Sequence, residues 1–401
     1  MEHVVFLCHR IPYPPNKGDK IRSYNLLRYL VERYKVHLGC FVDDPADQAF
    51  TEKLAPLCES LLCLPLRRGA GYLATPGALI SGTPLTLAFY RSRRMQRWVD
   101  EITARFDVSR FLVFSSSMAQ YLEGERFAPK HRVIDFVDVD SAKWAQYAAH
   151  KKGVASWIYR REHRTLRLYE SAIAAQFDRA IFVSADEADL FKQQLTQRER
   201  PKVSFLPNGV DTHYFDPEKE DCATAPCPSR YVAFTGAMDY WANVDAVVWF
   251  CQHVWPTLRS ENPDLRFLIV GGNPAKEVLE LQQLAGVEVT GRVKDIRPYI
   301  GNATLVIAPL RIARGIQNKV LEAMAMARPV VATSMAMEGL KTTASLCLKV
   351  ADEPAAFIEA CSDYLSGDTG ADGSPNRTHV LRHYGWPQVL EQLPSHLEGV
   401  Q

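Results

Sequence analysis

Three residues near position 320 have types and spacing that could bind a phosphate and a sugar hydroxyl. Gly315, Lys319 and Glu322 are three to four positions apart, which puts them on one face of a helix. A helix that begins after a glycine offers free backbone N–H groups and the positive end of its dipole. Lys319 can neutralise a phosphate there, and Glu322 can accept hydrogen bonds from a ribose. A solvated Lys-Glu pair on an ordinary helix fits the same pattern.

The segment that must position these residues, 303–335, reads as strand, loop, helix and strand. ATLVIAPL has the aliphatic composition of a buried parallel strand. From Ile316 to Ala327 the apolar residues recur at helical spacing, and Pro329 ends this helix before the strand PVVAT. The sequence therefore predicts that Lys319 follows the carboxyl end of a parallel strand.

Other predicted strands in the second half of the chain also end in glycine. RYVAFTG, RFLIVGG and VEVTGRV end at Gly236, at Gly271 and Gly272, and at Gly291. Glycines at these points keep the carboxyl edge of a Rossmann-like sheet open to a nucleotide. The chain has no G-x-G-x-x-G motif, so a dinucleotide is not favoured.

The first half of the chain opens as strand, loop, helix and strand, the start of a doubly wound sheet. Gly18 lies in the first loop, within RIPYPPNKGDK, where a glycine lets the backbone approach a ligand closely. A surface turn with solvated charges is an equally compatible interpretation.

Asp138 and Asp140 lie at the end of the predicted strand RVIDFVDV. The triplet has the DxD form of a metal motif, but no companion ligands are evident, so we predict no metal site. Acids at the end of a strand are also candidates for binding an acceptor hydroxyl or acting as a base.

Length and composition indicate a globular protein of two domains. The chain has 401 residues, 47% hydrophobic and 23% charged, with a net charge of +1, so no overall field attracts nucleic acid. Nine cysteines without CxxC or zinc-site spacing indicate reduced cytosolic thiols. No signal peptide or membrane span is predicted. We place the linker at 212–230, giving domains 1–210 and 211–379, with a helix at 380–401 packing back on the first.

Two segments mix arginines with apolar residues. Residues 67–97 hold six arginines, and residues 143–170 interleave basic residues with Trp144, Tyr147, Trp157 and Tyr159. Each could contact lipid or a lipid-linked acceptor. Solvated helix faces are the commoner explanation of both segments, and single-stranded nucleic acid is a weaker alternative for the second.

The ordered set of motifs resembles the retaining glycosyltransferases of family 4. It runs through IFVSADEADLF, LPNGVDTHYF, FTGAMDYWANVDAVVWF, FLIVGGNP and VTGRVKDI to the 303–335 segment. HRIPYPPNKGDKIRSYN and GAMDYWANVDAV are similar to the subfamily of sugar transferases linked to bacterial exopolysaccharide and PEP-CTERM/exosortase gene clusters. The resemblance implies an α/β GT-B fold, in which two Rossmann-like doubly wound domains face each other across a cleft.

The resemblance also implies site residues. Glu322 matches the second of two family glutamates, whereas Arg314 replaces the first, which holds the donor sugar. Asp138 stands where many members have a catalytic histidine. The family's basic pair on the diphosphate is missing, so Lys319, with Arg314 or Arg311, would supply that charge. Our catalytic candidates are Asp138, Lys319 and Arg314, and our donor-binding candidates are Gly18, Gly236, Asn243, Gly271, Gly272, Arg292, Val293, Gly315, Ile316, Gln317, Asn318, Lys319 and Glu322.

The implied activity is that of a retaining, metal-independent hexosyltransferase. It would move a sugar from a UDP- or GDP-sugar to a glycan or lipid-linked acceptor during exopolysaccharide synthesis. It would need no cofactor and would act in the cytoplasm, where peripheral contact with the inner face of the plasma membrane is an expected location. Two alternatives stay open, a GT-B nucleotide-sugar 2-epimerase and a nucleotide-sugar-binding protein that has lost catalysis.

Overall fold

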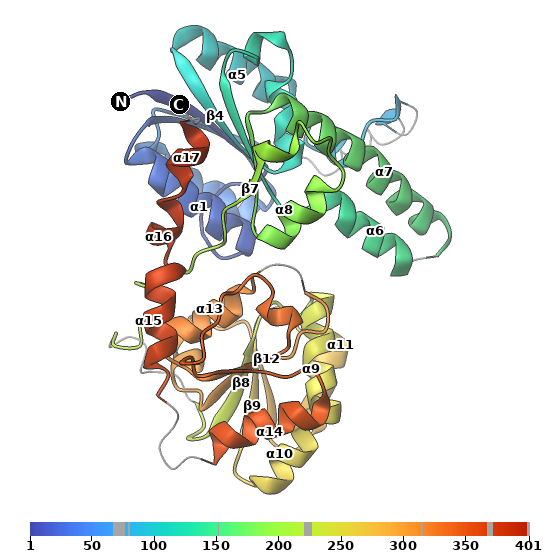
Figure 1. Cartoon of the computed structure of the whole chain (residues 1–401), viewed down its shortest axis with the longest axis vertical. Coiled ribbons are helices and arrows are strands. Elements are labelled where there is room, and N and C mark those ends of the chain that lie inside the picture. The colour runs from blue at the N-terminus through green and yellow to red at the C-terminus, as the bar shows by residue number, and fades with distance from the viewer. Residues whose placement is uncertain are drawn as a thin grey trace. The chain divides into compact units, whose positions relative to one another are not determined.

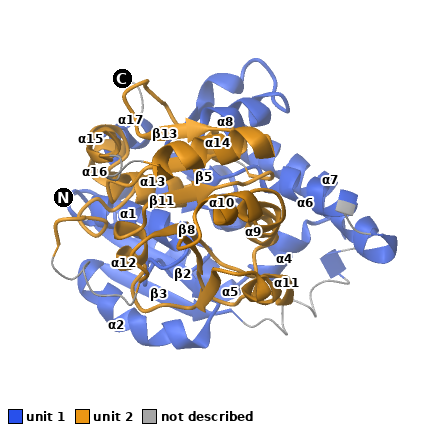
Figure 2. Cartoon of the chain, turned by 90° about the horizontal axis from the view of Figure 1, so that it is seen from below, with its two compact units in different colours: residues 1–206, 390–401 blue, residues 207–389 orange. Residues whose placement is uncertain are grey.

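The chain is described from a computed structural model, over residues 1–66, 77–78, 81–150, 152–219, 227–313, 316–366 and 372–398. It divides into two compact units (Figure 2), of which unit 1 is Met1–Leu206 with Leu390–Gln401 and unit 2 is Pro207–Val389. Each unit has its own parallel sheet and hydrophobic core.

Unit 1 is built on a seven-stranded sheet in the order β3-β2-β1-β4-β5-β6-β7. The strands pair in parallel, and β1, β2 and β4 are almost entirely buried, as continuous apolar runs predict. They are β1 (His3–Cys8), β2 (Lys35–Val42), β3 (Ser60–Pro65), β4 (Val108–Phe114), β5 (His131–Val137), β6 (Arg179–Phe182) and β7 (Val203–Phe205).

Helices join these strands and pack on the sheet. The longest is α7, which lies beside α6 (Figure 1). The helices of unit 1 are α1 (Gly18–Val31), α2 (Thr51–Leu54), α4 (Leu85–Phe89), α5 (Arg93–Arg105), α6 (Asp140–His150), α7 (Gly153–Gln176), α8 (Ala185–Lys192) and α17 (Leu393–Leu397).

Unit 2 has a six-stranded parallel sheet in the order β10-β9-β8-β11-β12-β13. Its strands are β8 (Tyr231–Thr235), β9 (Arg266–Val270), β10 (Val287–Gly291), β11 (Leu305–Ala308), β12 (Val330–Ala332) and β13 (Leu348–Val350). Its helices are α9 (Trp241–His253), α10 (Trp255–Glu261), α11 (Lys276–Glu280), α12 (Arg297–Gly301), α13 (Asn318–Ala325), α14 (Pro354–Leu365), α15 (Ser374–His383) and α16 (Trp386–Leu390), whose last residue belongs to unit 1. The predicted α/β class with two Rossmann-like halves is confirmed.

The division between the units differs slightly from the predicted domains. It falls after Leu206, because Val210 exchanges backbone hydrogen bonds with Tyr384 and Trp386 and so belongs with unit 2. The start of the predicted terminal helix also stays in unit 2, where Val380 is fully buried. The part that joins unit 1 begins at Leu390, and the His396 carbonyl there bonds to His131 of β5.

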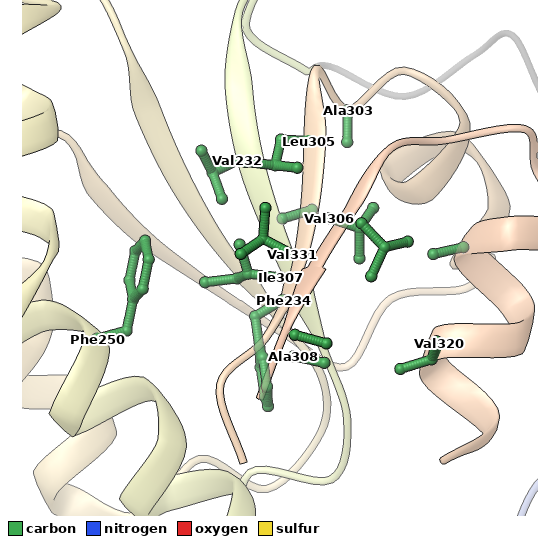
Figure 3. Packing of buried hydrophobic residues seen from close by; sticks show 14 of the residues in the cluster. Val232, Phe234, Phe250, Ala303, Leu305, Val306, Ile307, Ala308, Val320 and Val331 are labelled. Carbon is green, nitrogen blue, oxygen red and sulfur yellow. The ribbon is translucent and has the colours of Figure 1, made fainter. Parts of the chain in front are cut away.

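The core of unit 2 fixes the position of α13. Val232 and Phe234 of β8 and Ile307 of β11 are fully buried, and Val320 of α13 packs into the same cluster (Figure 3). Each such side chain contributes roughly 1.5–3 kcal/mol through burial. The start of α13 is thereby held close to the strand ends of unit 2.

Candidate functional site

Two glycines at neighbouring strand ends bring the backbone of unit 2 into unusually close approach. A Cβ atom on Gly271 would lie 1.7 Å from the carbonyl oxygen of Gly236. The Gly236 N–H donates to Val270 at 3.1 Å, and the Gly271 N–H donates to Gly291 at 3.2 Å. The ends of β8, β9 and β10 are therefore held together by backbone contacts that exclude larger residues at position 271.

Lys319 lies over the end of β8. Its Nζ donates a hydrogen bond of 2.6 Å to Oδ1 of Asn243, and Asn243 Nδ2 donates to the Ala237 carbonyl at 2.9 Å. The same Nζ lies 4.2 Å from the centre of the Phe234 ring, a cation–π distance. A Cβ on Gly236 would lie 3.2 Å from this Nζ. The structure thus brings together Gly236, Asn243 and Lys319, three predicted donor-binding residues.

Burial shifts the pKa values of both ionisable groups on this face of α13. Burial lowers the pKa of Lys319 to about 7, although the nearby Glu322 acts in the opposite direction. Burial also raises the pKa of Glu322 to about 7, against the effect of Lys319. Both groups therefore titrate near neutral pH, a feature that often marks a functional site.

The start of α13 lacks a side-chain cap. Its N-cap residue, Gln317, has an extended backbone and makes no side-chain cap hydrogen bond, and the Val320 N–H bonds to the Gln317 carbonyl at 3.0 Å. The N–H groups of the first two helical residues are therefore not capped from within the helix. Asn318 Oδ1 is buried without a hydrogen-bond partner among the described residues. The side chain of Ile316 packs in the hydrophobic core. Arg314 and Gly315 lie outside the described residues, so their roles stay predictions.

The remaining predicted residues of unit 2 lie around the end of β10. A Cβ on Gly272 would be 3.4 Å from Nε of Arg292, an exposed side chain that covers this glycine. Gly291 has φ of 69°, a conformation that favours glycine. Val293 is partly buried and packs against the core. These residues form a rim next to the Lys319 cluster.

Gly18 and Asp138 both belong to unit 1. Gly18 begins α1 and is exposed, and a Cβ there would meet no atom within 4 Å. The fold of the chain itself therefore does not require a glycine at this position. Asp138 follows β5, next to Val137, whose φ of 71° is strained for a β-branched residue.

Asp138 is held in an ion pair that the sequence analysis missed. Lys143 Nζ lies 2.6 Å from Asp138 and 3.4 Å from Asp140. Burial alone would lower the pKa of Lys143, but the two carboxylates raise it above its usual range. The spacing of Lys143, three residues after Asp140 on α6, was the available signal. To act as a base, Asp138 would first have to leave Lys143.

A second missed group is the buried Glu170 of α7. It accepts hydrogen bonds from the Ser141 hydroxyl at 2.5 Å and the Ser141 N–H at 3.2 Å. Burial, reinforced by Asp140, raises the pKa of Glu170 to about 8. No sequence pattern singled it out, because its partner lies 29 positions away on another helix.

Within the described ranges of the chain, no three histidine, cysteine, aspartate or glutamate side chains are grouped so that they could hold a metal ion. The two acids of the DxD triplet instead share Lys143. The expected independence of metal stays a prediction.

The comparison with protein families agrees with this arrangement. Residues 229–367, which include the Lys319 cluster, match the family model described as glycosyl transferases group 1. An uncharacterized 44.6 kDa protein in the cps region of Klebsiella pneumoniae is 22% identical over 386 residues, which cover 92% of each chain.

Solved structures share the fold over nearly the whole chain. Anabaena HepE, crystallised with UDP and glucose, has a TM-score of 0.66 at 15% identity and covers 98% of both chains. Sucrose-phosphate synthase from Thermosynechococcus elongatus has a TM-score of 0.71 at 15% identity, over 98% of this chain and 97% of the other. The predicted GT-B fold and glycosyltransferase class are confirmed at this level, and residues 229–367 match the group 1 model within that fold.

Proposed function

We propose that this protein is a retaining, metal-independent glycosyltransferase of bacterial exopolysaccharide synthesis. It transfers a hexose from a UDP- or GDP-sugar to a glycan or lipid-linked acceptor. The observation that carries the proposal is the half-buried Lys319 beside the uncapped start of α13, at the strand ends of a group 1 glycosyltransferase domain. HepE, of the same fold, was solved with UDP and with UDP-glucose, and the Klebsiella relative belongs to a cps region.

The chemistry requires that negative charge on the departing diphosphate be stabilised. Fixed cations and backbone N–H groups do this most effectively at a site with little water, where no reorganisation is needed. In this proposal Lys319 and the first N–H groups of α13 contact the diphosphate, and Glu322 accepts hydrogen bonds from the ribose. Asn243 holds Lys319 Nζ in place, through its own hydrogen bond to the Ala237 carbonyl.

Release of nucleotide from a panel of nucleotide sugars tests this function. We expect slow release of UDP or GDP without acceptor, since water can replace the acceptor hydroxyl. Appearance of an epimerised sugar would instead identify a 2-epimerase. Tight binding with no turnover would indicate a binding protein without catalysis. The ion pair with Lys143, which occupies the candidate catalytic carboxylate of Asp138, would agree with that outcome.

Exposed apolar and basic residues of α7 support the expected peripheral contact with a membrane. Val154, Trp157 and Leu168 are 75%, 55% and 69% exposed, and the arginines at 160, 164 and 167 are exposed beside them. Glu162, the one acid between residues 153 and 168, is buried. Basic residues beside exposed aromatic and aliphatic ones suit an anionic lipid surface. None of the helices in the described parts of the chain is long and apolar enough to cross a bilayer.

We expect the variant Arg160→Gln/Arg164→Gln to lose most of its binding to vesicles that contain anionic phospholipid. Each basic residue near such a surface contributes about 1 kcal/mol, so the loss should be roughly tenfold or more. Sedimentation with vesicles measures it. Arg198→Gln/Arg200→Gln, which removes the same charge elsewhere in unit 1, is the control. Equal binding by both variants and the unchanged protein would contradict this role for α7.

The affinity for UDP is expected to fall as the pH rises from 6 to 8.5. In the free protein the pKa of Lys319 is lowered to about 7, and a bound diphosphate would raise it again. The complex therefore holds more protons than the free protein above pH 7, and a rising pH opposes binding by up to about tenfold per pH unit. Calorimetric titration measures the trend, and Lys319→Arg, whose charge does not titrate, should show a much flatter one. An affinity that increases with pH would contradict this assignment.

A further inference from the structure

A groove in unit 1 combines apolar walls with positively charged side chains. It has a volume of about 710 Å³, within the range of small-molecule sites. Phe41 at the end of β2, Leu64 at the end of β3 and Phe89 at the end of α4 contribute apolar surface to it. No carboxylate lines the groove among the described residues. Its charged residues are Arg91, Arg93 and Arg94.

The three arginines are placed to bind an anion. All three are exposed, and none forms an ion pair with a described carboxylate. Arg93 and Arg94 begin the 13-residue helix α5, whose N-cap Ser92 accepts a hydrogen bond from the N–H of Met95. The positive end of this helix adds to their charge. Guanidinium groups bind phosphate through paired hydrogen bonds, so a phosphate or diphosphate is the anion that fits this set.

A second hollow, of about 500 Å³, adjoins the first and has a different lining. The two share Arg91 and Arg93. Beyond these arginines the lining becomes polar, with amide, carboxylate and phenol groups. The amide N–H groups here already donate within the protein, and the phenol donates to the carboxylate, so the oxygen atoms of this set are what is left to accept hydrogen bonds from sugar hydroxyls. These groups belong to Gln96, Gln120, Glu123 and Tyr169.

We propose that the two hollows together bind a lipid-linked acceptor. Its hydrocarbon chain lies along Phe41, Leu64 and Phe89, its phosphate or diphosphate contacts the arginines, and its first sugar enters the polar hollow. The order of apolar, cationic and polar surfaces matches the order of chemical groups in such a molecule. This inference rests on the proposed function and narrows its acceptor from any glycan to one carried on a lipid phosphate.

Calorimetric titration of the full chain with farnesyl diphosphate tests the inference. It is done in saturating UDP, so that the proposed diphosphate site at α13 is already occupied. Farnesol keeps only the hydrocarbon chain of farnesyl diphosphate, and inorganic pyrophosphate keeps only the diphosphate. We expect both to bind at least about tenfold more weakly than farnesyl diphosphate. If pyrophosphate binds as tightly as farnesyl diphosphate, the groove recognises free phosphate and the proposal is wrong. If farnesol binds as tightly, the groove is simply apolar, which also contradicts it.

Matched variants locate the site. Arg93→Gln/Arg94→Gln should weaken binding of farnesyl diphosphate about tenfold or more, whereas Arg97→Gln/Arg105→Gln, on the same helix but outside the lining, should leave it unchanged. Phe89→Ser should weaken the binding of farnesyl diphosphate but not that of pyrophosphate. Equal affinity of the two double-arginine variants for farnesyl diphosphate would overturn the proposal.

Nucleotide release without acceptor, measured on the same samples, separates this inference from the proposed function. Release by the unchanged protein together with no binding of farnesyl diphosphate would refute the inference alone. Binding of farnesyl diphosphate without release from any nucleotide sugar would refute the proposed function instead.

Discussion

Replacing Lys319 with alanine is expected to lower the rate of nucleotide release about 10²–10³-fold. A cation fixed where charge develops on a leaving group contributes this much in comparable sites. Lys319 is the described cation at the start of α13, and its Nζ is held by Asn243. Arg311 cannot simply replace it, because its guanidinium is paired with Asp245, Nε to Oδ2 at 3.0 Å. Steady-state release of UDP or GDP from the preferred nucleotide sugar measures the loss.

The same substitution should cost little stability. In the folded protein burial lowers the pKa of Lys319 from 10.5 to about 7, so between these values the folded state binds fewer protons than the unfolded state. This group therefore disfavours folding at pH 7, and its contribution improves as pH rises toward 10.5. Lys319→Met, which replaces the ammonium over the Phe234 ring with an uncharged side chain of similar length, should melt at an equal or higher temperature than the unchanged protein.

Two comparisons make the Lys319 prediction specific. Lys276→Ala removes a lysine of the same unit that is 87% exposed at its side chain, and it should leave the rate unchanged. Lys319→Arg keeps the charge and should retain a larger part of the activity than alanine does. Rates within about threefold of the unchanged protein in Lys319→Ala would exclude a contact between this lysine and the diphosphate.

Local patterns were enough to predict the βαβ unit that carries Lys319. The aliphatic run at β11, the helical spacing of Val320, Leu321 and Met324, and Pro329 before β12 are all signals within about thirty residues. The observed helix starts at Asn318, two residues after the predicted start. Glycines at strand ends were likewise visible in the sequence, because each follows a buried apolar run.

Contacts between distant segments could not be predicted in this way. The bond from Lys319 to Asn243 spans 76 positions and exists because β8 and β11 are neighbours in the sheet. Nothing in the local pattern fixes that order of strands. The groove of unit 1 has the same origin, since its apolar and basic residues come from β2, β3, α4 and α5. For Asp138 the missed partner is instead a local one. Lys143, five positions later, forms an ion pair with the carboxylate that would have to break before Asp138 could act as a base.

Gly271→Ala is expected to destabilise unit 2 by about 3 kcal/mol or more, a cost found when a tightly packed site is overfilled. The new Cβ would lie 1.7 Å from Gly236 O and 2.8 Å from Gly236 C. Because both are backbone atoms, neither can move aside as a flexible side chain would. Hydrogen bonds from Gly236 to Val270 and from Gly271 to Gly291 also hold the strand ends in place.

Gly272→Ala is a closely matched control, because it adds the same methyl group one residue later. The nearest atom to its Cβ would be Nε of Arg292 at 3.4 Å, and this exposed side chain can move into solvent. Urea unfolding monitored by tryptophan fluorescence measures the difference. We expect the midpoint of Gly272→Ala to lie near that of the unchanged protein, and the midpoint of Gly271→Ala to lie at a clearly lower urea concentration. Coincident curves would mean that the strand ends are farther apart than described, and that position 271 is glycine for another reason, such as contact with the donor. A difference between the two variants would instead assign Gly271 to the packing of the site.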